Sequence, residues 1–246
     1  MVAIIAFFVL HWYTSLFSQT FFLHRYSAHK MFLMNPFWEK FFYLFTYVTQ
    51  GSSYLSPRGY AILHRMHHAY SDTEKDPHTP HHTKNLFTMM WKTKEIYNGI
   101  INDELKPEAR FDGNIPTWKF VENMADSWPS RIFFGTFYVV MYIWFVPVDA
   151  WFLYLLLPFH FLMGPVHGAI VNWSGHKYGY QNFDNHDKSK NSVFLMDWLM
   201  MGELFQNNHH KLPKRLNFAA KWYEVDPTYP VIKMLSFLRI IKLKQV

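Results

Sequence analysis

The 246-residue chain contains no cysteine. Without thiolates it can form no disulfide, no thiolate zinc site and no cysteine-ligated iron–sulfur cluster. A tightly held metal ion must therefore be bound by imidazole, carboxylate or amide groups, or by water. Histidine is abundant, with 15 residues, and is the obvious candidate ligand.

Charged residues are missing from two long blocks. Residues 1–24 contain no Lys, Arg, Asp or Glu, and residues 132–176 contain only Asp149. The first block is long enough to cross a hydrocarbon core of roughly 30 Å as a helix, which predicts a membrane span over about residues 2–22. A cleaved signal peptide fits less well, because no basic residue precedes the apolar run and no small-residue cleavage site follows it.

The second block is interrupted by Pro147 and Asp149, which mark a tight turn between two helices. We therefore expect a membrane hairpin with spans over residues 131–146 and 150–171. Together with the N-terminal span, this hairpin predicts an all-α integral membrane protein with about three transmembrane helices.

The positions of the basic residues predict the orientation in the membrane. All 24 Lys and Arg residues fall in residues 25–131 and 177–246, and the positive-inside rule makes that side cytoplasmic. That side also holds 17 of the 18 acidic residues, all except Asp149, so its formal charge is 24 minus 17, or +7. We predict a single domain over residues 1–246, in which residues 25–130 and 177–246 form a cytoplasmic helical cap. In a bacterium the membrane would be the cytoplasmic membrane.

Short motifs hold most of the histidines. Side chains three and four residues apart share one face of a helix, so three of the motifs each present a convergent set of side chains. A convergent imidazole face is half of a metal site. The three sets are His64, His67 and His68; Gln206, His209 and His210; and Asn172 with His176.

A fourth motif contains His24 and His29, which are five residues apart and about 140° apart around an ideal helix. We expect this pair to reach one site only if the helix ends between the two residues. The first motif follows the N-terminal span and His176 follows the hairpin, so all four groups should lie at one membrane depth. Eight imidazoles exceed what one metal ion can use, and we predict a site for more than one ion.

Ligand chemistry alone leaves zinc, copper, iron and nickel open. A closed zinc site needs four ligands, whereas eight imidazoles with two amides would serve a pair of ions and leave room for oxygen. A bis-histidine haem protein is a further alternative, but it would place its histidines inside the spans. Only His11, His160 and His167 are so placed.

The boxes HxxxxH, HxxHH and xxxHH, with Asp-Pro-His after the second box, resemble those of the integral-membrane fatty acyl desaturases, and most of all the stearoyl-CoA or acyl-lipid delta-9 branch. The resemblance extends from Phe21 to the C-terminus. It implies an O2-dependent oxidoreductase that introduces a cis double bond, at the delta-9 position, into an acyl-CoA or lipid-linked acyl chain. The stretches that carry it are His64-Arg-Met-His-His-Ala-Tyr-Ser-Asp-Thr-Glu-Lys-Asp-Pro-His78, Asn172-Trp-Ser-Gly-His176, Gly202-Glu-Leu-Phe-Gln-Asn-Asn-His-His210 and Glu224-Val-Asp-Pro-Thr-Tyr229.

The same resemblance implies a centre of two iron ions, with Asn172 holding metal-bound water. Gln206 stands where the family usually has a further histidine, and it would ligate directly or through water. Family members also commonly carry two spans before the first box, and this chain has one. The implied imidazole ligands are His24, His29, His64, His67, His68, His176, His209 and His210.

Three carboxylates near the boxes, Asp72, Asp76 and Glu203, are candidates to accept hydrogen bonds from ligating imidazoles. His78 belongs to the Asp-Pro-His motif, and we predict that it lies outside the ligand set. His81, His82 and His186 are predicted to be loop residues.

The sequence has no GxGxxG motif for a flavin or nicotinamide and no cysteine for an iron–sulfur cluster. We therefore expect an external electron donor, such as a ferredoxin or a cytochrome b5-like protein, besides O2, the acyl substrate and membrane lipids. No nucleic acid partner is expected. Two alternatives stay open: a lipid hydroxylase on the same histidine scaffold, and a non-catalytic zinc-binding membrane protein.

Overall fold

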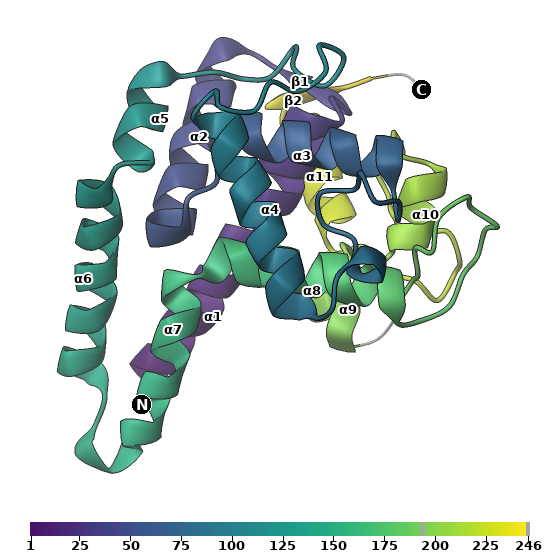
Figure 1. The fold of residues 1–246 in the computed structure, drawn as a ribbon. Helices are drawn as coiled ribbons and strands as arrows, with labels where there is room; N and C mark the ends of the chain where they lie inside the picture. Colours follow the sequence, from purple (N-terminus) through teal and green to yellow (C-terminus); the bar gives the residue numbers. More distant parts are fainter. Residues whose placement is uncertain (193–194, 245–246) are drawn as a thin grey trace.

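The computed structural model describes residues 1–192 and 195–244 and is mostly helical, as predicted. The described strands form one small antiparallel sheet, in which β1 (Phe32–Met34) pairs with β2 (Ile241–Leu243). This pairing fastens the C-terminal segment beside the end of the N-terminal helix. Figure 1 shows the helical cap in the upper part of the molecule and a group of long helices extending below it.

The N-terminal helix is longer than the predicted span. α1 (Val2–Phe17) runs without interruption into the π-helix η1 (Ser18–Ala28), in which every residue is buried. Together they make a helix of 27 residues, and among the described residues it is the one unbroken helix that is long and apolar enough to cross a membrane. The segment predicted over residues 2–22 is the lower part of this helix, which continues upward into the cap (Figure 1).

The residues of the predicted membrane hairpin form α6 (Trp128–Phe145), followed by η4 (Val148–Leu156), α7 (Leu157–Phe161) and α8 (Met163–Lys177). The turn between α6 and η4 lies at the foot of the molecule, at the same end as the N-terminus (Figure 1). A straight helix was expected over residues 150–171, but the chain bends by 78° after Phe161. The two arms together are apolar enough for one broken span or a re-entrant loop.

The bend has a backbone cause. Pro165 has no N–H to donate to the carbonyl of Phe161, four residues earlier. Instead, the Ser52 hydroxyl donates to the Phe161 carbonyl at 3.3 Å, and the Gly164 N–H donates to the Ser53 hydroxyl at 3.0 Å. Both serines belong to η2 (Gly51–Ser53), so this turn supplies the hydrogen bonds that the broken helix loses.

Several helices of the cap begin at a side chain that caps them. Asn35 caps α2 (Pro36–Gln50), and Ser56 caps α3 (Pro57–Tyr70). Asn85 and Thr88 form a reciprocal capping box at the start of α4. The remaining cap elements are η3 (Pro80–His82), α4 (Leu86–Ile101), α5 (Lys119–Ala125), α9 (Leu195–Leu199), α10 (Gln206–Lys211) and α11 (Thr228–Phe237).

The main hydrophobic core forms around η1. Phe21 and Phe22 are fully buried, and they pack with β1, α2, α11 and the segment around Phe205. α3 packs directly against η1, so the first and second histidine boxes lie side by side (Figure 1). The core therefore fixes the helices that carry the histidines.

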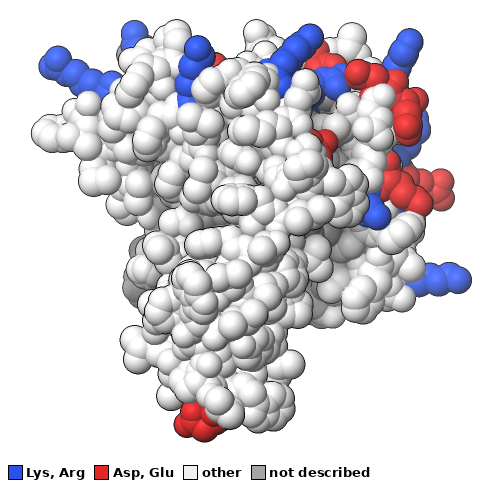
Figure 2. Space-filling view, turned by 90° about the vertical axis from the view of Figure 1, so that its left-hand side faces the viewer, with Lys and Arg blue, Asp and Glu red and all other residues white. Residues whose placement is uncertain are grey.

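The surface is divided by charge. In Figure 2 the Lys and Arg side chains gather along the cap, whereas a broad face below them is without charge down to an acidic tip. Large apolar side chains are exposed on this lower part, including Leu10, Phe133, Trp144 and Trp151. An exposed apolar surface of this kind indicates contact with a membrane.

Candidate metal centre

The first histidine box lies on π-helical backbone. The N–H of His29 donates to the carbonyl of His24 at 3.1 Å, a hydrogen bond between residues five apart. The wider turn of a π-helix places such residues on one face, and the two imidazole centroids lie 5.1 Å apart. The helix does end between His24 and His29, as expected, because η1 ends at Ala28 and His29 is its C-cap. The π-helical turn that precedes this end, which was not expected, brings the two rings together.

The second box lies on the last turns of α3, where His64, His67 and His68 share one face as predicted. Arg65 points the other way. Its guanidinium donates to the carbonyls of Ser27, at 3.0 Å, and Ala28, at 2.9 Å. These bonds attach α3 to the end of η1 and fix the two boxes relative to one another.

The eight histidines predicted as ligands converge in two groups. Within each group, one candidate nitrogen from every ring lies within 4.8 Å of the others. His24 Nε2 lies 3.0 Å from His209 Nε2 in the first group, and His67 Nε2 lies 3.2 Å from His176 Nε2 in the second. The first group is His24, His29, His64, His68 and His209, and the second is His67, His176 and His210.

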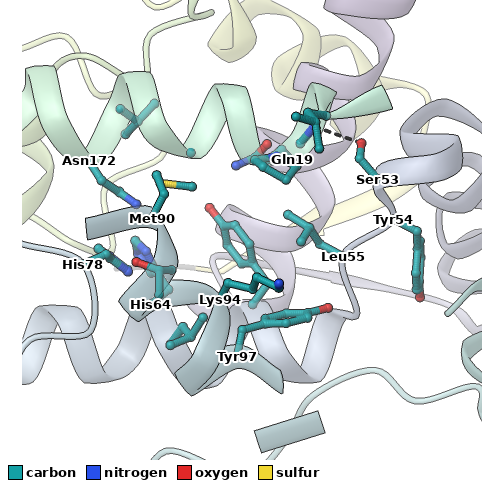
Figure 3. Close-up of a pocket in the computed structure, with 18 of the residues that line it drawn as sticks. Gln19, Ser53, Tyr54, Leu55, His64, His78, Met90, Lys94, Tyr97 and Asn172 are labelled. Carbon is teal, nitrogen blue, oxygen red and sulfur yellow. Dashed lines mark hydrogen bonds between the residues drawn. The ribbon is translucent and has the colours of Figure 1, made fainter. Parts of the chain in front are cut away.

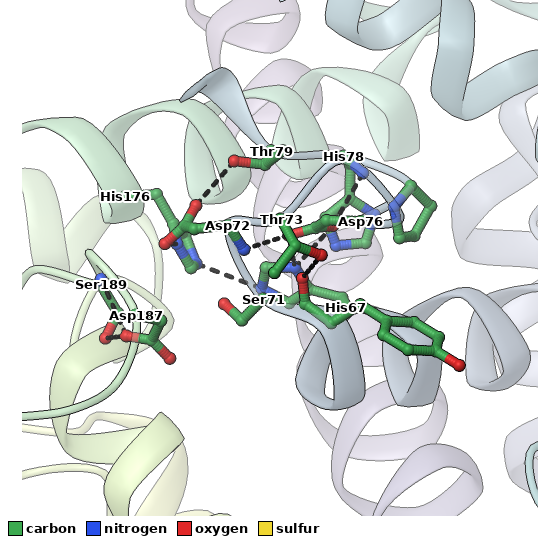
Figure 4. A network of polar contacts seen from close by, with 12 residues as sticks. His67, Ser71, Asp72, Thr73, Asp76, His78, Thr79, His176, Asp187 and Ser189 are labelled. Carbon is green, nitrogen blue, oxygen red and sulfur yellow. Dashed lines mark hydrogen bonds and ion pairs between the residues drawn. The ribbon is translucent and has the colours of Figure 1, made fainter. Parts of the chain in front are cut away.

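Carboxylates accept hydrogen bonds from the outer nitrogen of several of these rings. His24 Nδ1 donates to Glu203 at 2.7 Å, which confirms the predicted role of that carboxylate. Figure 4 shows the other carboxylates around the second group. The Nδ1 atoms of His67, His176 and His210 donate to Asp76 at 2.9 Å, Asp72 at 3.0 Å and Asp187 at 2.6 Å respectively.

The roles predicted for Asp72 and Asp76 are thus confirmed, but Asp187 was not predicted. It lies 23 residues before His210, in the loop after α8, and no sequence spacing relates the two residues. Burial acts to raise the pKa of Asp187, but hydrogen bonds from His210 and Ser189 outweigh it and hold the pKa below its usual range. Asp187 is therefore ionised at neutral pH.

The protonation pattern of the second group fits a bound cation. Burial is the main cause that lowers the pKa of His67 and His210, so these rings are neutral at neutral pH. A carboxylate can only accept, so each Nδ1 carries the ring's proton and each Nε2 is a lone pair. The lone pair of His67 faces that of His210 at 3.2 Å. With no proton between them, these nitrogens repel one another unless a cation lies among them.

A buried ion-pair network supports the first group. The fully buried Arg25 donates to Glu203 at 3.1 Å and to Asp226 at 2.8 Å, and its guanidinium lies 3.8 Å from the ring centroid of Phe218. Phe218 in turn packs on His209, with ring centroids 4.5 Å apart. Arg25 thereby holds the carboxylate that orients His24, a role that no sequence motif indicates.

The two predicted amide ligands lie beside the histidines. Gln206 is buried, and its amide N–H donates to the carbonyl of Glu203 at 2.6 Å, which leaves its amide oxygen free of that bond. A Cβ atom on Gly175 would lie only 2.5 Å from Gln206 Cγ, so the side chain of Gln206 occupies the space that this glycine leaves. Asn172 lies one turn before His176 on α8. Metal binding by either amide stays a prediction.

The other histidines have distinct surroundings. His78 is buried, and among the described residues its two ring nitrogens have no hydrogen-bond partner. It forms a third possible metal-binding group with His67 and Asp76. His81 and His82 were predicted to be loop residues, but both lie in the short 3-10 helix η3. His81 Nε2 lies 2.9 Å from the carbonyl oxygen of His176. Its exclusion from the ligand set, like that of His78, stays a prediction.

A cavity of about 780 Å³ opens beside the two groups. Figure 3 shows its wall, in which His64 and Asn172 lie toward one end and Ser53 and Tyr54 toward the other. Apart from the histidine end, most of the wall comes from apolar and aromatic side chains of α4, α8 and the η2 region. The cavity therefore offers an apolar chain a position against the histidines.

Comparison with known proteins agrees with this geometry. The family model described as "Fatty acid desaturase" matches residues 1–235. The chain is similar to the sn-1 stearoyl-lipid 9-desaturase of Anabaena variabilis, with 26% identity over 94% of this chain and 79% of the relative. It is also similar to the Delta-9 desaturase-like 5 protein of Arabidopsis thaliana, with 29% identity over 94% and 73% of the two chains.

A third relative is the Acyl-CoA 5-desaturase AL21 of Anemone leveillei, with 28% identity over 90% of this chain and 65% of the relative. All three relatives are named as desaturases, which agrees with the family that the histidine boxes resemble. The chain therefore belongs to the fatty acid desaturase family, a membrane-associated family of oxidoreductases that act on fatty acyl chains and generally use iron.

Proposed function

We propose that this chain is an O2-dependent fatty acyl desaturase that forms a cis double bond, at the delta-9 position, at a histidine-ligated di-iron centre. The proposal rests on one observation: two imidazole groups lie beside an apolar cavity, and in the second group the lone pairs of His67 and His210 face one another. The names of two relatives, a stearoyl-lipid 9-desaturase and a delta-9 desaturase-like protein, support the position of the double bond.

In this proposal each imidazole group holds one iron ion. His24, His29, His64, His68 and His209 bind the first ion, and His67, His176 and His210 bind the second. Gln206 would ligate an iron directly or through water, and Asn172 would hold a metal-bound water. When bound, the iron pair supplies the O2-dependent oxidation that removes two hydrogens from adjacent methylene carbons, which carry no acidic proton for a general base to remove.

The chain's own residues orient the imidazole rings and bind the acyl chain. Glu203, Asp72, Asp76 and Asp187 fix the direction of the imidazole rings and raise the basicity of their Nε2 atoms. The cavity wall holds an acyl chain against the histidine end and excludes water from it. Because the acyl chain is held in one position, only one pair of its carbon atoms lies within reach of the oxidant.

The proposed reaction needs two electrons and two protons for each O2 that is reduced to two waters while the acyl chain loses two hydrogens. We found no sequence motif for an internal redox cofactor, so the electrons come from a ferredoxin or a cytochrome b5-like donor. The basic surface of the cap suits an acidic donor. The substrate class is an acyl-CoA or a lipid-linked acyl chain, as in the names of the relatives.

The proposal includes a topology. The chain is one domain over residues 1–246, with three spans formed by the N-terminal helix, by α6, and by η4 with α7 and the start of α8. The histidine boxes lie in the cytoplasmic cap. The charge-free lower face and the basic cap in Figure 2 support this orientation.

The test is expression in a host that lacks the expected product, followed by fatty-acid analysis and metal analysis of the purified chain. We expect new monounsaturated acyl chains and about two irons per chain, because each group has enough imidazoles for one ion. The double variant His68→Ala/His209→Ala should lose iron and all new double bonds, whereas His186→Ala, in an exposed part of a loop, should keep both. Hydroxy acids without double bonds would indicate a hydroxylase, and zinc without any product would indicate a metal-binding protein.

A further inference from the structure

The cavity beside the histidines has a mouth whose rim is apolar. Among the residues that line the cavity, four large apolar side chains are 54–84% exposed. Such side chains are unfavourable at an opening that faces water. They are Phe87 and Trp91 on α4, Trp128 at the start of α6, and Leu162 at the bend between α7 and α8.

The mouth lies where the lower helices meet the cap. Trp128 begins α6, which descends from the cap, and Leu162 marks the point where the ascending η4–α7 arm turns into α8 (Figure 1). Tryptophan side chains are enriched at this level in membrane proteins, at the boundary between hydrocarbon and headgroups. The cavity therefore opens sideways, at the height of the membrane interface.

The charge at the mouth is low. The basic residues that line the cavity are Arg131 and Lys94. The Arg131 guanidinium is already paired with Asp126 and donates to the Ser52 carbonyl at 2.9 Å. The Lys94 ammonium lies 4.3 Å from the ring centroid of Trp91, and in the part of the chain that the structure describes it has no hydrogen bond or ion pair. The Glu95 carboxylate accepts a hydrogen bond from Trp91 and adds a negative charge on the same helix.

This charge pattern distinguishes two carriers of an acyl chain. Coenzyme A carries a diphosphate and a further phosphate, and proteins bind such groups with several Arg and Lys side chains. One free ammonium beside a carboxylate gives little attraction to them. A membrane glycerolipid, by contrast, needs an apolar opening and at most one cation for its headgroup phosphate.

We propose that the acyl chain enters the cavity sideways from the bilayer while it is esterified to a membrane glycerolipid, through the mouth formed by Phe87, Trp91, Trp128 and Leu162. This inference rests on the proposed function and specifies its substrate. In this arrangement the Lys94 ammonium binds the phosphate of the lipid headgroup.

The carrier is tested in cells that express the full chain together with a working electron donor. The cells receive a brief pulse of labelled saturated fatty acid, and the glycerolipid and acyl-CoA pools are separated at short times. We expect labelled monounsaturated chains to appear first in glycerolipids. Their earlier appearance in acyl-CoA would overturn the inference, while the absence of any new double bond would instead reject the proposed function.

The position of the mouth is tested without any reaction. Because the chain has no cysteine, Phe87→Cys and Trp128→Cys each create a unique site for a spin label in vesicles of phosphatidylglycerol and phosphatidylethanolamine. We expect both labels to collide more often with O2, which concentrates in lipid, than with a water-soluble nickel complex. Ala109→Cys, in an exposed polar loop of the cap, is the control and should show the reverse. Labels at the mouth that behave like the control would overturn lateral entry.

Discussion

The two imidazole groups are held in different ways. The first group has five histidines, and one of them, His24, donates to a carboxylate. The second group has three histidines, and every one of them donates to a carboxylate. Metal binding by the first group would be strong because the group has many ligands. Metal binding by the second group would depend more on the correct orientation of each of its three rings. A change of one residue should therefore weaken the second group more than the first.

The largest effect is expected from removing one ligand. His67→Ala leaves two imidazoles in the second group, so the purified chain should hold about one iron instead of two and should form no double bonds. His29→Ala leaves four imidazoles in the first group and should retain both ions. Metal analysis of the two purified variants measures this contrast, and equal iron loss from both would refute the comparison.

A smaller effect is expected from the carboxylates of the second group. Asp187→Asn keeps the shape of the side chain but removes the charge that fixes the proton on His210 Nδ1. We expect about 10–100-fold weaker binding of one iron, measured by titration with a chelator. Glu108→Gln, at an exposed carboxylate far from the histidines in the sequence, is the matched control. Unchanged retention of iron in Asp187→Asn would show that the ring is oriented by packing alone.

The substitution Gln206→His tests whether the second group can accept a fourth imidazole ligand. An imidazole at this position would add a fourth ring to the three that are present, so the variant should keep both irons and release the second more slowly to a chelator. The space beside Gly175 limits the side chain that fits. Loss of iron from this variant, with the fold intact by circular dichroism, would mean that position 206 does not face the second ion.

The smallest effect concerns a buried carboxylate that has no imidazole partner. Burial, together with repulsion from Asp226, raises the pKa of Asp197 from 3.8 to about 8. The folded chain therefore binds a proton that the unfolded chain has lost, and its stability falls as the pH rises through about 8. Thermal midpoints in detergent at pH 6 and pH 9 should differ more for the wild-type chain than for Asp197→Asn. Equal differences would show that Asp197 is ionised like the paired carboxylates.

The parts of the site that local helical spacing determines were predictable. The face shared by His64, His67 and His68 follows from spacings of three and four on α3, and the same spacings relate Gln206 to His209 and His210 on α10. The candidate carboxylates Asp72, Asp76 and Glu203 lie close to the boxes in sequence. Only Asp76 accepts from a histidine of its own segment, His67, nine residues earlier. Glu203 accepts from His24 and Asp72 accepts from His176, so those partners come from distant segments.

Other parts depend on contacts between distant segments. The π-helical backbone of η1 departs from the regular helix that the spacing argument assumed, and its packing against α3 is not visible in the box itself. Asp187 meets His210 only because the loop after α8 folds back onto α10. Arg25 reaches Asp226, 201 residues later. No local pattern encodes such pairs.

The bend after Phe161 has a cause that is visible in the sequence, but its effect depends on distant residues. Pro165 was visible in the sequence, but a proline in a membrane helix is tolerated when neighbouring groups satisfy the freed carbonyl. Here Ser52 and Ser53 bond to the bend from a distant turn, so the Phe161 carbonyl and the Gly164 N–H both have hydrogen-bond partners where the helix bends sharply. The consequence is functional, since the bend places Leu162 at the mouth of the cavity.

The central claim is that the two imidazole groups hold two iron ions in different surroundings. Mössbauer spectroscopy of the full chain, purified in detergent after growth on ⁵⁷Fe, tests it most directly. We predict two iron signals of equal area for the wild-type chain and the loss of one of them in His67→Ala. A single signal that accounts for only one iron per chain, or a purified chain that holds zinc in place of iron, would contradict the account.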